Sequence, residues 1–288
     1  MLKIFLWFVS TDTSHLEGAI KILERQHNGL EIVGAAASGE ISDVDRRGNF
    51  DVLLFVGTRG LGTNKIVQAV RQLNLPEEKL LGDWIVFIPG FTLEKYRRLQ
   101  RSRPSIFSMN CFGGMLSHVL GLPFRSPFVN LSLSEKDFLK FLQSPRAYLE
   151  QEPHFEKLIG KSLEAPDGYP LLSLGNIFLN MMHYKNSREA LDKWNDRKRR
   201  INWQNLFVTM CTEDEKFLRT FDALPYEKKV CFVPFKSDLN SAWYINPAID
   251  KEAASFTEKI NNFSFGKFFY YDVFDMLLYG KKTQLIEM

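Results

Sequence analysis

One cysteine of this sequence lies where a nucleophile would be expected. Cys111 follows the apolar segment 105–107 and precedes Gly113 and Gly114 in the stretch Ser-Met-Asn-Cys-Phe-Gly-Gly, residues 108–114. Two glycines allow a sharp backbone turn and leave room for a ligand. A helix that begins near Gly114 would point its unpaired N–H groups at this turn, where their field favours a thiolate and stabilises an oxyanion. The pattern therefore predicts either a cysteine nucleophile or a small buried thiol in a tight strand–helix turn.

A cysteine nucleophile needs a general base, and His183 is the best candidate by position. It follows the predicted strand 176–182 and precedes Tyr184. In a parallel α/β sheet the carboxyl ends of the strands share one edge, so we expect His183 and Cys111 to lie on the same edge. An unperturbed histidine titrates near pH ~6.5, in the range needed for general acid–base catalysis. A hydrogen-bonded histidine at a strand end is the alternative interpretation.

A basic helix is predicted over residues 187–200, with Arg197 and Arg200 in its last turns. Cations near a helix C-terminus stabilise the helix through its dipole. Arginine side chains also recognise phosphate and carboxylate groups as planar forks. Trp194 and Trp203 lie close to these cations in the sequence and could stack on a sugar ring or a base. Recognition of an anionic substrate is therefore the functional alternative to helix-end electrostatics.

Strands that alternate with helices are expected to position these residues. The N-terminal part of the sequence predicts strands at residues 2–9, 29–37, 51–57 and 84–88, and helices at residues 15–26 and 62–73. This alternation predicts a Rossmann-like parallel sheet with right-handed crossovers. The phosphate-binding patterns G-x-G-x-x-G and G-K-S/T are missing from it. We therefore favour a structural or sugar-recognising role over dinucleotide binding.

Four arginines in residues 97–103, followed by Pro104, mark the predicted boundary between two α/β domains, 1–103 and 104–288. We interpret this basic segment as a solvated linker, with an anion-binding edge as the alternative. The second domain predicts strands at residues 105–108, 128–133, 176–182, 206–210, 230–234 and 268–271, and helices at residues 114–120, 134–142, 187–200, 213–221 and 249–260.

Composition limits the class of protein. The 288 residues are 45% hydrophobic and 25% charged, with a net charge of +3, which is too small to indicate a nucleic-acid partner. Three cysteines without C-x-x-C spacing predict reduced thiols in a cytoplasm and no zinc site. No metal site is predicted elsewhere, because the D-x-D at Asp43 and Asp45 has no supporting carboxylates. We also expect no membrane span, since no apolar run reaches about eighteen residues. No signal peptide is expected, because the short apolar N-terminus lacks a basic n-region and a cleavage site.

Several of these motifs together resemble a known family. The motifs are residues 107–114, Ser126-Pro127, His183-Tyr184, and the series Trp194, Arg197, Arg200-Ile201-Asn202. They are similar to S-x-N-C-W-G-G, S-P, H-Y and W-x-x-R-x-x-R-I-N of bacterial exopolysaccharide biosynthesis proteins, the domain of unknown function DUF1919. The similarity covers about residues 104–280, with Phe112 in place of the usual tryptophan. The Asn-Cys pair also resembles, more weakly, a turn of polysaccharide acetyltransferases.

The resemblance implies a cytoplasmic protein of surface or exopolysaccharide biosynthesis. We expect a transferase, with acyl transfer favoured, that acts on a carbohydrate or carrier-linked precursor. Cys111 would be the nucleophile, His183 the base, and Asn110 the group that orients the substrate or the oxyanion. Substrate contacts are expected from Ser108, Gly113, Gly114, Tyr184, Trp194, Arg197 and Arg200. Acyl-coenzyme A or a nucleotide-sugar could be the donor, and a non-catalytic sugar- or partner-binding protein of the same pathway is the alternative.

Overall fold

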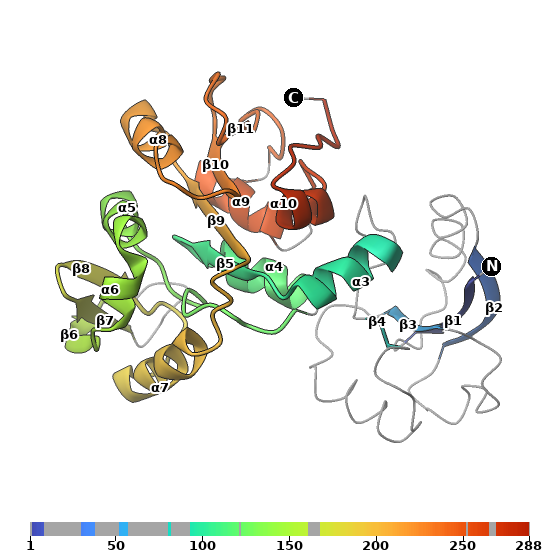
Figure 1. Cartoon of the computed structure of the whole chain (residues 1–288), viewed down its shortest axis with the longest axis horizontal. Helices are drawn as coiled ribbons and strands as arrows, with labels where there is room; N and C mark the ends of the chain where they lie inside the picture. The colour runs from blue at the N-terminus through green and yellow to red at the C-terminus, as the bar shows by residue number, and fades with distance from the viewer. Residues whose placement is uncertain are drawn as a thin grey trace. The chain divides into compact units, whose positions relative to one another are not determined.

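Residue contacts in the computed structural model divide the chain into two compact units (Figure 1). The first comprises residues 1–93 with 119–121, and the second comprises residues 94–118 and 122–288. The structure describes residues 2–8, 30–37, 52–56, 80–81, 93–120, 122–160, 168–251, 253–264 and 269–287. Among the described helices, none has the length and apolar character needed to cross a bilayer.

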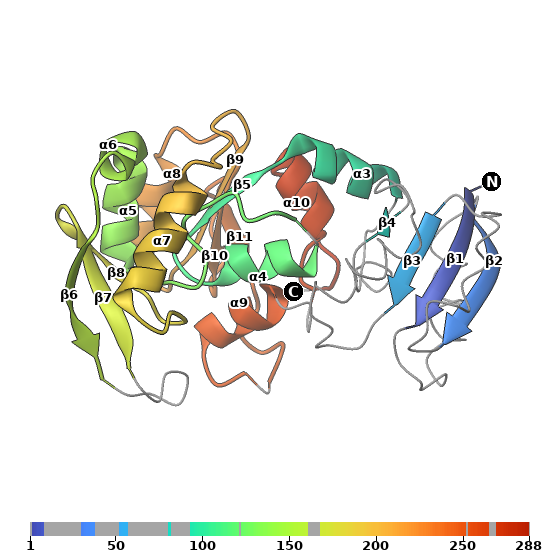
Figure 2. The same ribbon diagram turned by 90° about the horizontal axis from the view of Figure 1, so that it is seen from below.

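The first unit contains a four-stranded parallel sheet in the order β2-β1-β3-β4. The strands are β1 (Leu2–Phe8), β2 (Leu30–Ala37), β3 (Val52–Val56) and β4 (Leu80–Leu81). Figure 2 shows β1, β2 and β3 side by side, which confirms three of the four predicted strands. The fourth predicted strand, at residues 84–88, and both predicted helices lie outside the described residues.

The second unit contains another four-stranded parallel sheet, in the order β11-β10-β9-β5. Its strands are β5 (Ser105–Ser108), β9 (Leu206–Cys211), β10 (Lys229–Val233) and β11 (Ala242–Tyr244). The first three confirm predicted strands, and β11 is short enough that its sequence gave no signal. The helices of this unit are α3 (Leu93–Ser102), α4 (Phe112–Val119), α5 (Glu135–Gln143), α6 (Pro145–Leu149), α7 (Ser187–Lys198), α8 (Glu215–Asp222), α9 (Phe256–Ser264) and α10 (Val273–Tyr279).

Apolar side chains cover both faces of this second sheet. On one face, Phe107 of β5 and Val208 of β9 pack in a core cluster with residues of α5, α7 and α8. On the other face, Phe112 of α4 lies with its ring centroid 5.3 Å from that of Phe232 in β10. Phe263 of α9 completes this group at 5.7 Å from Phe232. The combination confirms the predicted α/β class.

A three-stranded antiparallel sheet forms a further layer of the second unit. It consists of β6 (His154–Ile159), β7 (Tyr169–Leu174) and β8 (Ile177–Asn180), in that order. Only β8 was predicted from the sequence. Alternate residues of β7 are buried, whereas β6 is exposed along nearly its whole length, so its sequence lacks the alternation of a half-buried strand.

Two predicted strands of the second unit are not strands in the structure. The 126–133 segment, which contains the apolar run 128–133, is an extended loop, with an isolated bridge between Ser132 and Asn180. Its apolar residues point into the core, and Asn130 has a positive φ of 63° that interrupts any ladder. Near the C-terminus, Tyr271 forms an isolated bridge with Gln284 in place of a strand.

Two helical boundaries also differ from the sequence prediction. The predicted helix 249–260 begins only at Phe256: Asp250 has a positive φ of 55°, and Ser255 Oγ accepts from the Glu258 N–H at 3.1 Å where the helix starts. The arginine-rich segment interpreted as a linker is the end of α3, which stops where Arg103 has a φ of 49° before Pro104. The Asn202 amide donates to the Arg103 carbonyl at 3.0 Å and so supplies a partner that this helix end lacks.

Candidate functional site

The carboxyl end of β5 leads into α4 through a tight turn that its own polar side chains hold. Asn110 Oδ1 accepts a hydrogen bond from the Phe112 N–H at 3.1 Å. Ser108 Oγ accepts from the Gly113 N–H at 3.1 Å and donates to the Asn110 carbonyl at 2.7 Å. The helix begins at Phe112, two residues earlier than predicted, so Cys111 directly precedes it. The first two N–H groups of α4 are therefore paired within the turn.

Both glycines of this motif lie in close packing contacts. A Cβ atom on Gly113 would lie 2.7 Å from Ile106 Cγ2 and 2.8 Å from Ser108 Oγ. One on Gly114 would lie 3.0 Å from Val129 Cγ1. The glycines thus let α4 approach β5 and the 126–133 segment, and a role in contacting substrate stays a prediction.

The three thiols differ in exposure. Cys111 is partly exposed, whereas Cys211 and Cys231 are buried. Burial, together with the charges of Glu135 and Glu213, raises the pKa of Cys211 to about 12, although a hydrogen bond from Asn110 opposes this shift. Burial also raises the pKa of Cys231 well above its ordinary value. Cys111 is therefore the thiol best placed to react at neutral pH, because nucleophilic attack requires the thiolate and access to solvent.

A buried arginine forms the second part of the site. The Tyr184 hydroxyl donates to the Val129 carbonyl at 2.7 Å, and Arg197 Nη1 donates to the same hydroxyl at 2.6 Å. Arg197 is 8% exposed and lies with Cζ 5.1 Å from the ring centroid of Phe124. No carboxylate of the described residues pairs with it. Burial raises the pKa of Tyr184, with Arg197 opposing part of that shift, so the hydroxyl stays protonated at neutral pH.

Two observations connect this arginine with the cysteine. Val129, which accepts from Tyr184, is also the residue that Gly114 of α4 approaches. The charge of a Cys111 thiolate reaches the Tyr184 hydroxyl and is one of the influences that raise the pKa of this tyrosine. Val129 thus contacts both α4, through Gly114, and the Tyr184 hydroxyl to which Arg197 donates.

Of the other predicted site residues, His183 is exposed and Trp194 is buried. His183 is exposed in the loop after β8, where its backbone N–H donates to the Asn130 carbonyl at 3.4 Å. Its pairing with Cys111 stays a prediction. Trp194 is 1% exposed and packs edge-on against Phe128, so its ring is enclosed in the core.

Arg200 lies two residues beyond the end of α7 and differs from Arg197, which lies within it. Arg200 is exposed and pairs with Asp196 one turn earlier, whereas Arg197 points inward. Sequence reasoning also missed Phe124 and Val129, because a backbone carbonyl acceptor and a ring beneath a guanidinium leave no pattern in the sequence. Among the described residues, no group of three His, Cys, Asp or Glu side chains is arranged to hold a metal.

Comparison with known proteins gives the family. The domain of unknown function DUF1919 matches residues 85–279, a range that includes Cys111, Tyr184 and Arg197. A protein of Haemophilus influenzae (strain ATCC 51907 / DSM 11121 / KW20 / Rd), described as uncharacterized, is similar to this chain. The two are 38% identical over 154 residues, which are 52% of this chain and 71% of that protein. Because the matched range covers more than half of the sequence, this protein belongs to the DUF1919 family.

Proposed function

We propose that this protein is a cytoplasmic transferase of surface or exopolysaccharide biosynthesis, in which Cys111 carries an acyl group to a carbohydrate or carrier-linked precursor. The observation that carries the proposal is the position of Cys111. It is partly exposed and directly precedes α4, and the charge of its thiolate is one of the influences that raise the pKa of Tyr184. The field at a helix N-terminus favours a thiolate. The polysaccharide assignment is supported by the sequence motifs.

The proposed reaction has two steps. The Cys111 thiolate attacks the carbonyl carbon of an acyl thioester such as acyl-coenzyme A, and the new carbon–sulfur bond replaces the bond to coenzyme A. The departing thiolate takes up a proton from solvent. A sugar hydroxyl then attacks the Cys111 thioester, loses its proton to His183, and restores the Cys111 thiolate. The positive charge of Arg197 would stabilise the anionic carbonyl oxygen in both steps.

Site-resolved alkylation and acylation test this proposal. We expect iodoacetamide at pH 7.5 to label Cys111 at least tenfold faster than Cys211 or Cys231 in the folded protein. Acetyl-coenzyme A should give an acetylated protein whose adduct maps to Cys111 and is removed by hydroxylamine. Cys111→Ser should abolish the adduct, and the buried-thiol control Cys231→Ala should keep it. An unreactive Cys111, or an adduct that survives Cys111→Ser, would overturn the proposal.

A second candidate is a non-catalytic binding protein of the same pathway. Two observations favour it: Asn110 and Ser108 already occupy the first two N–H groups of α4, and the predicted base His183 lies exposed in a loop. This protein would bind its ligand equally well with and without the Cys111 thiol. A ligand at a hundredfold excess over its Kd adds ~2.7 kcal/mol of stability. An equal thermal shift in wild type and Cys111→Ser, without any acyl adduct, would establish binding alone.

A further inference from the structure

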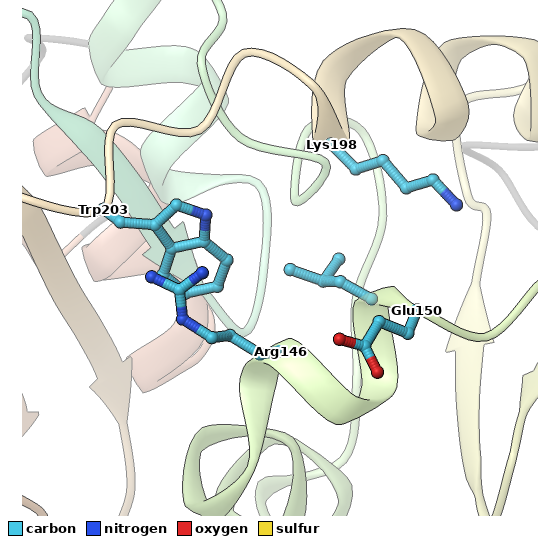
Figure 3. A pocket seen from close by; sticks show the side chains of 5 residues that line it. Arg146, Glu150, Lys198 and Trp203 are labelled. Carbon is cyan, nitrogen blue, oxygen red and sulfur yellow. The ribbon is translucent and has the colours of Figure 1, made fainter.

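A separate cavity of the second unit lies between α6, the end of α7 and the segment that follows α7. Its volume is about 220 Å³, and Figure 3 shows the side chains that line it. They are Arg146, Leu149, Glu150, Lys198 and Trp203. Small-molecule sites in proteins usually occupy roughly 300–1,000 Å³. The smaller volume suits one ring of a ligand and is too small for a whole nucleotide.

Charged groups of this cavity lack the partners expected from their spacing. Arg146 and Glu150 are four residues apart across α6, a spacing at which opposite charges commonly pair. The Arg146 guanidinium instead stacks on Trp203, with Cζ 4.0 Å from the ring centroid. Figure 3 shows the Glu150 carboxylate lying apart from it. Within the described chain neither side chain forms an ion pair, so both keep hydrogen-bonding capacity for a ligand.

The other residues that line the cavity add a hydrogen-bond donor, a second cation and an apolar surface. Trp203 Nε1 donates no hydrogen bond to any described residue, and its indole edge and Leu149 give the cavity an apolar surface. Lys198 pairs with Glu152 at 2.8 Å, and this hydrogen bond is the main reason that the pKa of Glu152 lies below its ordinary value. The lining therefore carries two cations and the Glu150 carboxylate, and Glu152, which is not a lining residue, offsets the charge of Lys198.

We infer that this cavity binds one pyranose ring of a neutral saccharide. A sugar hydroxyl is both a hydrogen-bond donor and an acceptor. It can accept from the N–H groups of Arg146 and Trp203 and donate to the Glu150 carboxylate. The C–H face of the ring contacts Leu149. An acidic sugar or a phosphate fits less well, because Glu150 would repel it and Lys198 is already paired. The inference goes beyond the proposed transfer reaction and requires no role for Cys111.

Saturation-transfer-difference NMR on the full-length chain tests this inference. The probes are the methyl β-glycosides of glucose, galactose and N-acetylglucosamine, with glucuronate and inorganic phosphate as anionic competitors. We expect saturation transfer to at least one neutral glycoside. Equimolar phosphate should not reduce this signal. The signal should fall at least fivefold in Arg146→Gln, in Glu150→Gln and in Trp203→Phe, which keeps an aromatic ring but removes the N–H.

Two controls make the outcome specific. Arg219→Gln removes another exposed arginine, which pairs with Glu215 on α8 and is not part of the cavity lining, and should leave the signal unchanged. Cys111→Ser should also leave it unchanged, so failure of the transferase proposal does not affect this result. Absence of transfer from all three glycosides, an equal signal in wild type and Arg146→Gln, or displacement by glucuronate or phosphate would each overturn the inference.

Discussion

The turn before α4 and the cavity beside α6 use their polar side chains in opposite ways. In the turn, the side chains of Ser108 and Asn110 accept hydrogen bonds from the first two backbone N–H groups of α4. In the cavity, Arg146 and Glu150 stand four residues apart without pairing with any described carboxylate or cation. The polar groups of the turn thus have hydrogen-bond partners within the chain, whereas Arg146 and Glu150 of the cavity have no ion-pair partner among the described residues.

This difference separates residues that hold the fold from residues that can recognise a ligand. A buried polar group must be hydrogen-bonded, because leaving it unpaired costs free energy. The family motif around Cys111 therefore contains several side chains whose partners lie inside the protein, with Cys111 itself left partly exposed. Of the cavity residues, the sequence analysis singled out Trp203, whereas Arg146 and Glu150 carried no recognisable pattern and are exposed in the structure.

The largest loss of stability is expected when the buried hydrogen bonds of Tyr184, beside the turn in the candidate site, are broken. Tyr184→Phe removes the hydroxyl that accepts from Arg197, and leaves this buried cation with the Val129 carbonyl at 3.4 Å and the Phe124 ring. We expect the free energy of unfolding to fall by about 3 kcal/mol, because a buried charged donor loses its main acceptor. Urea denaturation measures the change. Tyr279→Phe, at a tyrosine that is 45% exposed, is the control and should change stability little.

A smaller loss is expected when the turn is overpacked. Gly113→Ala introduces a Cβ atom 2.7 Å from Ile106 Cγ2, so α4 must shift away from β5, and we expect a loss of about 2 kcal/mol. Gly160→Ala is a matched control, because its Cβ atom would meet nothing within 4 Å. Thermal and urea unfolding should show no comparable loss there. Equal effects of the two substitutions would show that the turn is not tightly packed.

Apolar segments made much of the fold predictable. The strands β5, β9 and β10 are short apolar segments whose residues are nearly all buried, and they were predicted as strands together with the helix α7. The helix α5 was predicted at residues 134–142, and in the structure the Ser134 side chain accepts from the Asp137 N–H at its start. The parallel arrangement also followed from the alternation of strands and helices.

The candidate site was less predictable, because sequence spacing does not say which side chain turns inward. Arg197 and Arg200 both fall in the predicted helix 187–200 and look equivalent in the sequence, but only Arg197 is buried, and Arg200 lies just beyond the end of α7. The apolar run 128–133 resembles a strand, and the bend at Asn130 instead presents the Val129 carbonyl to Tyr184. Such contacts depend on the tertiary fold, and no local pattern encodes them.

A third prediction concerns charges that do pair within the chain, at the contact between α3 and α10. Lys95 Nζ lies 2.7 Å from Asp275 Oδ1 and 2.9 Å from Asp272 Oδ2. Burial acts to raise the pKa of Asp275, but hydrogen bonds from Lys95 and Thr283 outweigh it, so this pKa lies below its ordinary value. The resulting stabilisation is complete above the unfolded-state pKa of about 3.9. It is lost as the pH falls through the lower folded-state pKa.

Urea denaturation between pH 6 and pH 3 should therefore show a loss of stability that begins near pH 4. Asp275→Asn should flatten this part of the profile, because an amide does not titrate. A profile of unchanged slope in the variant would exclude Asp275 as its source.

The smallest stability effect is expected at the cavity, where it sharpens the distinction between the two regions. Glu150→Gln removes a charge that has no partner in the described chain, so we expect a change within about 0.5 kcal/mol. Arg146→Gln also removes the stacking of a guanidinium on Trp203, which is worth ~0.5–1 kcal/mol at an exposed site. Both variants should unfold almost as the wild type does in urea while losing the saccharide signal. A loss of 2 kcal/mol or more in either one would mean that the cavity residues hold the fold as the turn residues do, and the contrast between the two regions would disappear.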